Sequence, residues 1–272
     1  MHRFIRAGAA LLAACLLTAL SACSGTSDPS GKTSAAPTTA AKLDPWTVYQ
    51  QAEKKMSELP SFEISLEQNA NLEADGSSIA STATGTIKMA SQNGALSKFD
   101  IAMSSKSMGA TVDTRVYYAD GVMYTDMLGM KLRQEVSAEE ALSTLQSGGA
   151  TTYEEKDFAN AEVSTKDGNT VLTIRLADDA VLEQMSSSLE NMEGTPTVSD
   201  AAVTITIGAD GYLAETAASL GVEVSGAKIT STITAKYADP NTSVSIEPPA
   251  DLDSYVASDQ LNLSDYLGLL AE

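Results

Sequence analysis

The chain has 272 residues, with 36 acidic residues against 17 lysines and arginines, and its formal net charge is −19. So acidic a surface repels the phosphate backbones of nucleic acids, and we expect no nucleic-acid partner. The length is sufficient for one domain with a large core.

The N-terminal segment has the layout of an export signal. Arg3 and Arg6 precede an apolar run from Ala9 to Leu20, which is too short to remain in a bilayer as a membrane span. The run ends in Leu-Ser-Ala-Cys at residues 20–23, which resembles the bacterial lipobox at every position. This resemblance implies that residues 1–22 are a signal peptide and that Cys23 carries a diacylglyceryl thioether. The alternative is an ordinary signal peptide with an incidental cysteine.

A lipidated Cys23 would place the protein on a membrane. Two or three acyl chains provide stable anchoring, whereas one chain alone gives only marginal binding. We therefore expect an extracytoplasmic protein on the outer face of the bacterial cell membrane, or in the outer membrane if the cell is Gram-negative.

Processing would also remove most of the chemistry that catalysis needs. The only histidine is His2, and Cys15 is the only cysteine besides Cys23. The mature chain would therefore lack Ser-His-Asp and Cys-His catalysis, histidine metal sites and disulfides. We expect a protein that is not an enzyme and needs no cofactor or metal.

Residues 23–42 form the expected lipid-bearing tether. The stretch after Cys23 consists mainly of Ser, Thr, Ala, Gly and Pro, and it has too few large apolar side chains to fold. We expect residues 43–272 to form one domain.

The domain begins with a predicted helix and a series of strands. Asp44-Pro45 is a helix start, and apolar residues then recur every three or four positions until Pro60. From Ser61 the apolar period becomes two, which predicts strands separated by turns. The turns are expected at Asp75-Gly76, Asn93-Gly94, Asp120-Gly121 and Leu128-Gly129.

The second half is predicted to repeat this arrangement. Ser137 to Glu140 forms a capping box that starts a helix, and another helix starts at Asp178. Further strands are predicted around Asp167-Gly168 and over residues 203–207, 212–224 and 227–237, with an edge strand over Ser243–Glu247. A closing helix is predicted over residues 264–270.

These patterns predict an α+β fold. Hairpin-joined strands with a few inserted helices favour a single curved antiparallel sheet of about 10–11 strands, forming an unclosed half-barrel. Three or four helices are expected to cover its concave face.

The order of these elements resembles the LolA/LolB-type lipoprotein-carrier fold. It is similar to the LppX/LprG-type lipoproteins and to related uncharacterised Gram-positive extracytoplasmic lipoproteins. The hairpin Tyr118 to Lys131 and the segment Tyr237 to Asn241, which leads to Val244–Pro248, carry this resemblance. It implies a half-barrel whose hollow accepts acyl chains, without a catalytic residue.

Small residues and methionines indicate where such a hollow would lie. Ala83 and Gly85 supply little volume in the second strand, which suits either a ligand cavity or a close helix contact. Methionines suit surfaces that adapt to varied apolar ligands, although a single methionine is more often core filler. The candidate lining residues are Ala83, Gly85, Ile87, Met89, Phe99, Ile101, Met103, Val112, Met123, Met127, Met130 and Met185.

Two functions are compatible with this sequence. The first is a membrane-anchored lipoprotein that binds or carries a lipid or another hydrophobic ligand. The second is a non-catalytic envelope scaffold or interaction protein whose core is filled. The sequence does not identify a protein partner.

Lipidation of Cys23 is directly testable. We expect Cys23→Ser to abolish incorporation of a clickable palmitate analogue in growing cells, because the thiol is the acylation site. Cys15→Ser is the matched control and should leave labelling intact. Equal labelling of the Cys23→Ser protein would show that lipid is attached elsewhere or not through the lipobox.

Overall fold

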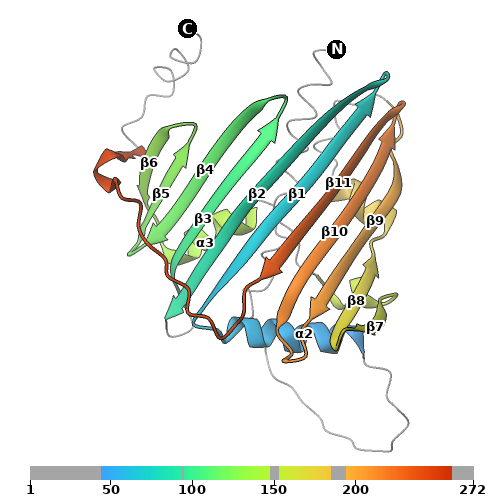
Figure 1. The fold of residues 1–272 in the computed structure, drawn as a ribbon, viewed down its shortest axis with the longest axis horizontal. Helices are drawn as coiled ribbons and strands as arrows, with labels where there is room; N and C mark the ends of the chain where they lie inside the picture. Colours follow the sequence, from blue (N-terminus) through green and yellow to red (C-terminus); the bar gives the residue numbers. More distant parts are fainter. Residues whose placement is uncertain (1–43, 93–94, 148–152, 185–193, 259–272) are drawn as a thin grey trace, which may run out of the picture.

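The computed structural model describes residues 44–92, 95–147, 153–184 and 194–258. Its dominant feature is one 12-stranded sheet with the spatial order β12-β6-β5-β4-β3-β2-β1-β11-β10-β9-β8-β7 (Figure 1). The end strands β12 and β7 do not pair with each other, so the sheet remains unclosed. This confirms the predicted open, sheet-dominated class.

Consecutive hairpins build the first half of the sheet. Its strands are β1 (Ser61–Ala74), β2 (Ser77–Gln92), β3 (Ala95–Ser107), β4 (Ala110–Ala119), β5 (Val122–Met127) and β6 (Met130–Glu135). The second half contains β7 (Glu162–Lys166), β8 (Asn169–Arg175), β9 (Thr197–Ile207), β10 (Leu213–Val224) and β11 (Ala227–Tyr237). The halves join where β11 pairs antiparallel with β1.

Two-residue turns with positive φ connect several of these strands, as the twist of a hairpin requires. The predicted turns with this geometry are Asp75-Gly76, Asp120-Gly121, Leu128-Gly129 and Asp167-Gly168. Asn93-Gly94 lies outside the described residues. Tight turns fix the register, so each strand keeps its apolar set on one face of the sheet.

Helix α2 (Pro45–Ser57) begins where the sequence predicts. Asp44 Oδ2 accepts hydrogen bonds from the hydroxyl of Thr47 at 2.5 Å and from its backbone N at 2.9 Å, and these two bonds lower the pKa of the Asp44 carboxyl. The helix lies across one end of the sheet (Figure 1) and buries Tyr49, Ala52 and Met56.

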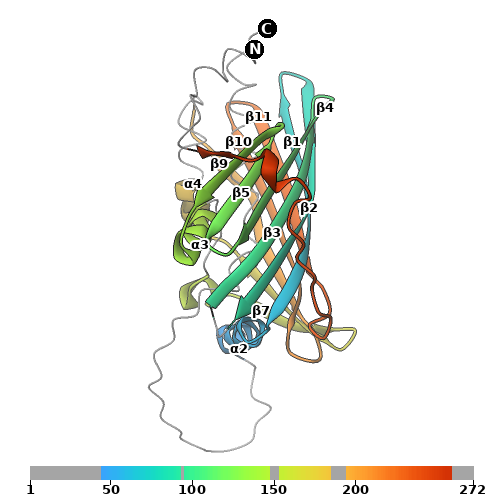
Figure 2. The ribbon, with the colours of Figure 1, turned by 90° about the vertical axis from the view of Figure 1, so that its left-hand side faces the viewer.

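Helix α3 (Ala138–Ser147) follows the predicted capping box. The backbone N of Glu140 donates to Ser137 Oγ at 3.1 Å, and the backbone N of Ser137 donates to Glu140 Oε2 at 2.8 Å. Helix α4 (Asp178–Gln184) starts at the predicted residue. Figure 2 shows α2, α3 and α4 on the same side of the sheet, which we call the inner face.

The predicted numbers of helices and strands need correction. Only α2 and α3, with 13 and 10 residues, are substantial helices in the described ranges, while α4 has seven; the expected layer of three to four helices is therefore not supported. The sheet has 12 strands rather than 10–11. The predicted helix over 264–270 lies outside the described residues.

The predicted edge strand Ser243–Glu247 is wrong. After β11 the chain forms a strap, residues 238–255, that crosses the face opposite the helices, which we call the outer face (Figures 1 and 2). Strand β1 is already paired on both sides, so the strap has no free edge to join there. It reaches one at β6, where β12 (Val256–Ala257) pairs in parallel with Leu132 and Arg133.

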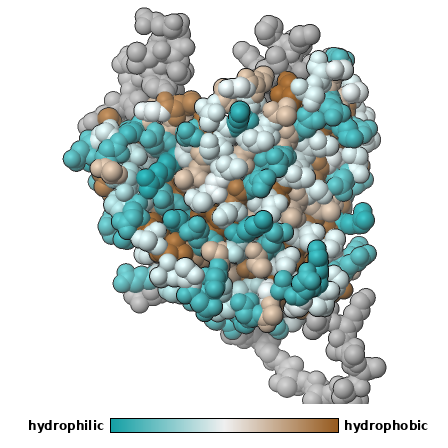
Figure 3. Space-filling view, in the orientation of Figure 1, coloured by the Kyte–Doolittle hydropathy of each residue, from teal (hydrophilic) through white to brown (hydrophobic). Residues whose placement is uncertain are grey.

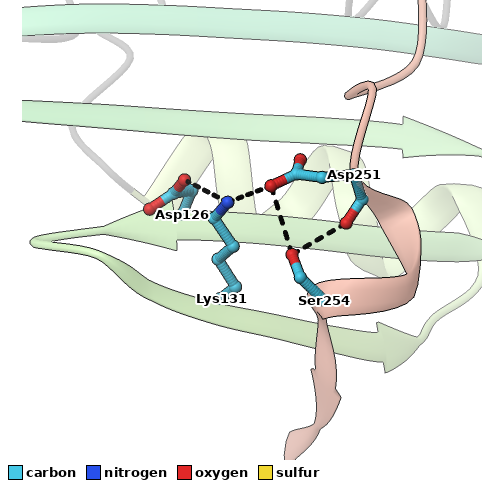
Figure 4. Close-up of polar contacts among 4 residues, drawn as sticks. All are labelled: Asp126, Lys131, Asp251 and Ser254. Carbon is cyan, nitrogen blue, oxygen red and sulfur yellow. Dashed lines mark hydrogen bonds and ion pairs between the residues drawn. The ribbon is translucent and has the colours of Figure 1, made fainter.

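Polar contacts hold the strap on the outer face. Arg115 donates to both carboxylate oxygens of Asp100 at 2.8 and 3.0 Å, and its Nη2 also donates to the backbone oxygen of Glu247 at 3.0 Å. Nearer the C-terminal end, Lys131 lies between Asp251 and Asp126 (Figure 4). The hydrogen bond from Lys131 lowers the pKa of the Asp251 carboxyl.

None of the helices in the described ranges is long and apolar enough to cross a bilayer.

The packing of α2 predicts a pH-dependent effect at Glu53. This side chain is partly buried, and burial raises the pKa of its carboxyl, although the Tyr49 hydroxyl donates to it at 2.5 Å. A raised pKa in the folded state means that ionisation of Glu53 destabilises the fold as the pH rises through that pKa. We therefore expect Glu53→Gln to melt at a higher temperature than the parent protein at about pH 7, and at the same temperature below about pH 4.

Melting curves measured across this pH range provide the check. Glu58→Gln, at an exposed position just after the same helix, is the matched control. A Glu53→Gln protein that melts below the parent at neutral pH would contradict the expected sign.

Candidate functional site

The inner face of the sheet is uncharged. Strand alternation and register place Ile64, Ile87 and Ile101 on this face, whereas Glu63, Lys88 and Asp100 point outward. Among the described strand positions of the inner face, from β7 to β6, none carries a charged side chain. In a chain with a net charge of −19, this segregation indicates a face that is covered by protein or by an apolar ligand.

A packed core occupies the end of the inner face near α2. Phe99 and Ile87 from the sheet are 0% and 1% exposed, and Tyr49 and Met56 from α2 belong to the same cluster. The aromatic rings are close, with centroids 5.0 Å apart between Tyr49 and Phe158. This end of the sheet is closed by its own side chains.

A second, smaller apolar cluster lies on the same face toward α4. Val181 from α4 contacts Val222 and Ile229, and Leu72 packs against them. Burial of three such side chains is modest compared with the cluster near α2.

A band of small and polar residues lies between the two clusters on β1, β2, β10 and β11, while Leu176 packs against both clusters. It contains Ala70, Ser81, Ala83, Ala218, Ser231 and Gln68, all of which the strand register places on the inner face. Gln68 is 2% exposed, and neither Nε2 nor Oε1 of its amide has a hydrogen-bond partner among the described residues. Buried polar groups without partners are rare and costly, so this position requires an explanation.

Sequence reasoning missed Gln68. The signal was present, because a glutamine continues the apolar alternation of Phe62, Ile64 and Leu66 at the next inward position. The strap contacts were also missed, because a sequence does not show which charged residues pair when they lie far apart in the chain.

The predicted lining residues divide into three groups. Ala83, Ile87, Met89 and Phe99 are buried; Gly85, Ile101, Met103, Val112, Met123 and Met130 are intermediate; Met127 is 41% exposed. Met185 and Cys23 lie outside the described residues. The register brings Gly85, Met103, Thr114 and Met127 into one row across β2 to β5, so the intermediate group extends from the packed core toward the β6 side.

The space above Gly85 is already occupied. A Cβ at this position would overlap the sulfur of Met103 and lie 2.5 Å from the backbone oxygen of Ala102. Gly85 is therefore a close-packing position rather than open floor, and its close neighbours come from strand β3 and not from a helix, as the second interpretation of the sequence had it.

A groove of about 930 Å³ lies on the other side of the sheet. Thr84, Thr86, Ala102, Ser104 and Arg115 line it, and their register places these side chains on the outer face. Gly85, Met103 and Val112 from the predicted lining also border it. Figure 3, in the same orientation as Figure 1, shows this face as mostly hydrophilic or intermediate with scattered hydrophobic residues. Its lining includes threonine, serine, aspartate and arginine side chains and so differs from the apolar hollow that Met123, Met127 and Met130 were expected to line.

The described ranges contain no group of three or more histidine, cysteine, aspartate and glutamate side chains that could hold a metal ion. Burial raises the pKa of the Tyr153 hydroxyl, which also lacks a described hydrogen-bond partner.

Comparison with known proteins gives a limited likeness. No protein-family model and no curated protein matches the sequence. Similar solved structures include LprF from Mycobacterium bovis, with a TM-score of 0.35, 13% identity, and coverage of 75% of this chain and 96% of that chain. LprF is a lipoprotein of the LppX/LprG family that the sequence resembles.

Two further solved structures show weaker similarity. The ywiB protein from Bacillus subtilis has a TM-score of 0.24 and 10% identity, covering 68% of this chain and 99% of that chain. A porin-like protein from Bacteroides uniformis has a TM-score of 0.23 and 10% identity, covering 67% of this chain and 96% of that chain. With TM-scores below 0.5, none of these structures assigns a function to this chain.

Close packing at Gly85 is testable by mutation. We expect Gly85→Leu to lower the free energy of unfolding by about 1–3 kcal/mol, because the added atoms meet Met103 and the Ala102 backbone. Thr82→Leu, at an exposed position on the same strand, should change it by less than about 0.5 kcal/mol. Denaturant unfolding measures both values. A Gly85→Leu protein as stable as the parent would show that this part of the inner face is open.

Proposed function

We propose that this protein is a lipid-anchored extracytoplasmic lipoprotein that binds a lipid or another apolar ligand on the inner face of its sheet. The observation that carries this proposal is the uncharged inner face in a strongly acidic chain. Ligand sites of this kind are mostly apolar, with a few placed polar groups.

The inner face is buried unevenly. Near α2 the side chains are fully packed, but on β3 to β6 the inward residues Met103, Val112, Met130 and Leu132 are only partly buried. A filled core would remove such side chains from water, because each buried CH₂ contributes roughly 0.8 kcal/mol. An apolar ligand placed there would gain the same contribution.

The remaining parts of the proposal come from the sequence. The lipobox at Cys23 supports anchoring to the outer face of the cell membrane, and residues 23–42 would link the anchor to the domain over 43–272. The lack of histidine and free thiol in the mature chain supports a binding protein rather than an enzyme.

The alternative is an envelope scaffold with a filled core. The extensive cluster around Phe99, Tyr49 and Phe158 favours it, because close packing needs no ligand. The two functions differ in one measurable property, which is uptake of an acyl chain by the inner face.

Photolabelling of the full-length protein in dodecyl maltoside micelles tests this property. We expect a diazirine-bearing acyl probe to label the parent protein, and Val112→Glu to reduce labelling by at least about tenfold, because a charge must then be buried beside the chain. Thr111→Glu is the matched control on the adjacent, outward and exposed position, and should label like the parent.

Absence of labelling in the parent protein would favour the scaffold. Equal loss in both variants would place the acyl chain on the outer face or on no defined site, and would contradict binding to the inner face.

A further inference from the structure

We propose that Gln68 recognises an uncharged polar group inside the ligand, so that the ligand is an ester- or amide-linked lipid rather than a plain hydrocarbon or an ionised fatty acid. This inference rests on the proposed binding of an apolar ligand to the inner face. Its basis is a buried amide that the described protein leaves without a partner.

Gln68 lies on β1, at the middle of the sheet. Its register partners are Ala83 on β2 and Ile233 on β11, and its side chain shares their inner face. Gln68 is only 2% exposed, yet both Oε1 and Nε2 lack a hydrogen-bond partner among the described residues. An amide can donate two hydrogen bonds and accept two, and burying it unpaired is unfavourable.

Small and hydroxyl-bearing side chains surround Gln68 on the inner face. Its neighbours across the strands are Ala83 on β2 and Ile233 on β11, the small residue Ala70 follows two positions along β1, and the diagonal positions carry Ser81 and Ser231, each 6% exposed. Ser81 Oγ makes only a long contact of 3.5 Å with the backbone oxygen of Ala70. The band therefore offers several hydrogen-bonding groups in an otherwise apolar face.

The position of Gln68 between the two apolar clusters indicates the shape of the ligand. Along β1, Ile64 belongs to the cluster near α2, while Leu72, four residues beyond Gln68, packs against the cluster near α4. Each lies about 13 Å from Gln68 at 3.3 Å per residue. Because protein side chains fill the end near α2, a ligand with its linkage at the amide would place its hydrocarbon on the other side, toward the smaller cluster near α4.

The electrostatics of the inner face select for a neutral linkage. A carboxylate or phosphate would need a cation, and the described inner strand positions supply none. Ester and amide carbonyls accept from Nε2, and an amide N–H or a hydroxyl donates to Oε1.

Three diazirine probes with the same chain length test this inference on the full-length protein in dodecyl maltoside micelles: a monoacylglycerol, an alkane and a fatty acid. We expect the monoacylglycerol to label the parent about threefold to tenfold more than the alkane, which is the effect of one net hydrogen bond, and more than the fatty acid. Gln68→Leu should label equally with the monoacylglycerol and the alkane.

The probe-free stability of Gln68→Leu gives a second measurement. Leucine removes an unpaired buried amide, so the melting temperature should stay the same or rise. Gln134→Leu is the matched control, because it is the same substitution at an exposed inward position on β6. It should retain the preference for the monoacylglycerol.

The outcomes separate this inference from the proposed function. No labelling of the parent by any probe would reject ligand binding itself. Labelling by the alkane and monoacylglycerol without preference, or a preference that survives in Gln68→Leu, would overturn the role of Gln68 while leaving ligand binding in place; the amide would then bind water only. A lower melting temperature with loss of all labelling would make Gln68 a structural residue and also overturn the inference.

Discussion

The structure depends on one constraint, which is that a wide antiparallel sheet with one uncharged face must keep that face from water. Strand alternation puts Ile64, Ile87 and Phe99 inward and Glu63, Lys88 and Asp100 outward, and the short turns prevent a slip of register that would exchange them. Near α2 the inward side chains are buried, whereas Met103, Val112, Met130 and Leu132 on β3 to β6 are only partly buried.

The two faces of the sheet are covered in different ways. On the inner face, α2 closes one end through Tyr49 and Met56, and Val181 of α4 contributes a smaller cluster at the other end. On the outer face, the strap is held by Arg115 and Lys131 and brings β12 to the free edge of β6. Covering that edge limits pairing with other chains. The outer contacts are polar because this face is already compatible with water.

Gln68 stands out because it departs from the pattern that its own strand establishes. Gly85, by contrast, is explained by close approach of Met103, so a small residue and a buried polar residue on the same face have different causes. A small residue is explained by close packing, whereas a buried amide without a hydrogen-bond partner is not explained by any contact within the described protein. This difference is why the polar band, rather than the small residues alone, points to a ligand.

The sequence by itself determined the strand alternation, the caps at Asp44 and Ser137, and the Asp-Gly turns, because these depend on contacts between residues close in the chain. It also predicted the open sheet, since hairpins follow one another in order. It did not determine the path of the strap, the filling of Gly85 by Met103, or the isolation of Gln68. Those features depend on which edges remain free and on which side chains meet across strands, and only the tertiary structure decides such contacts.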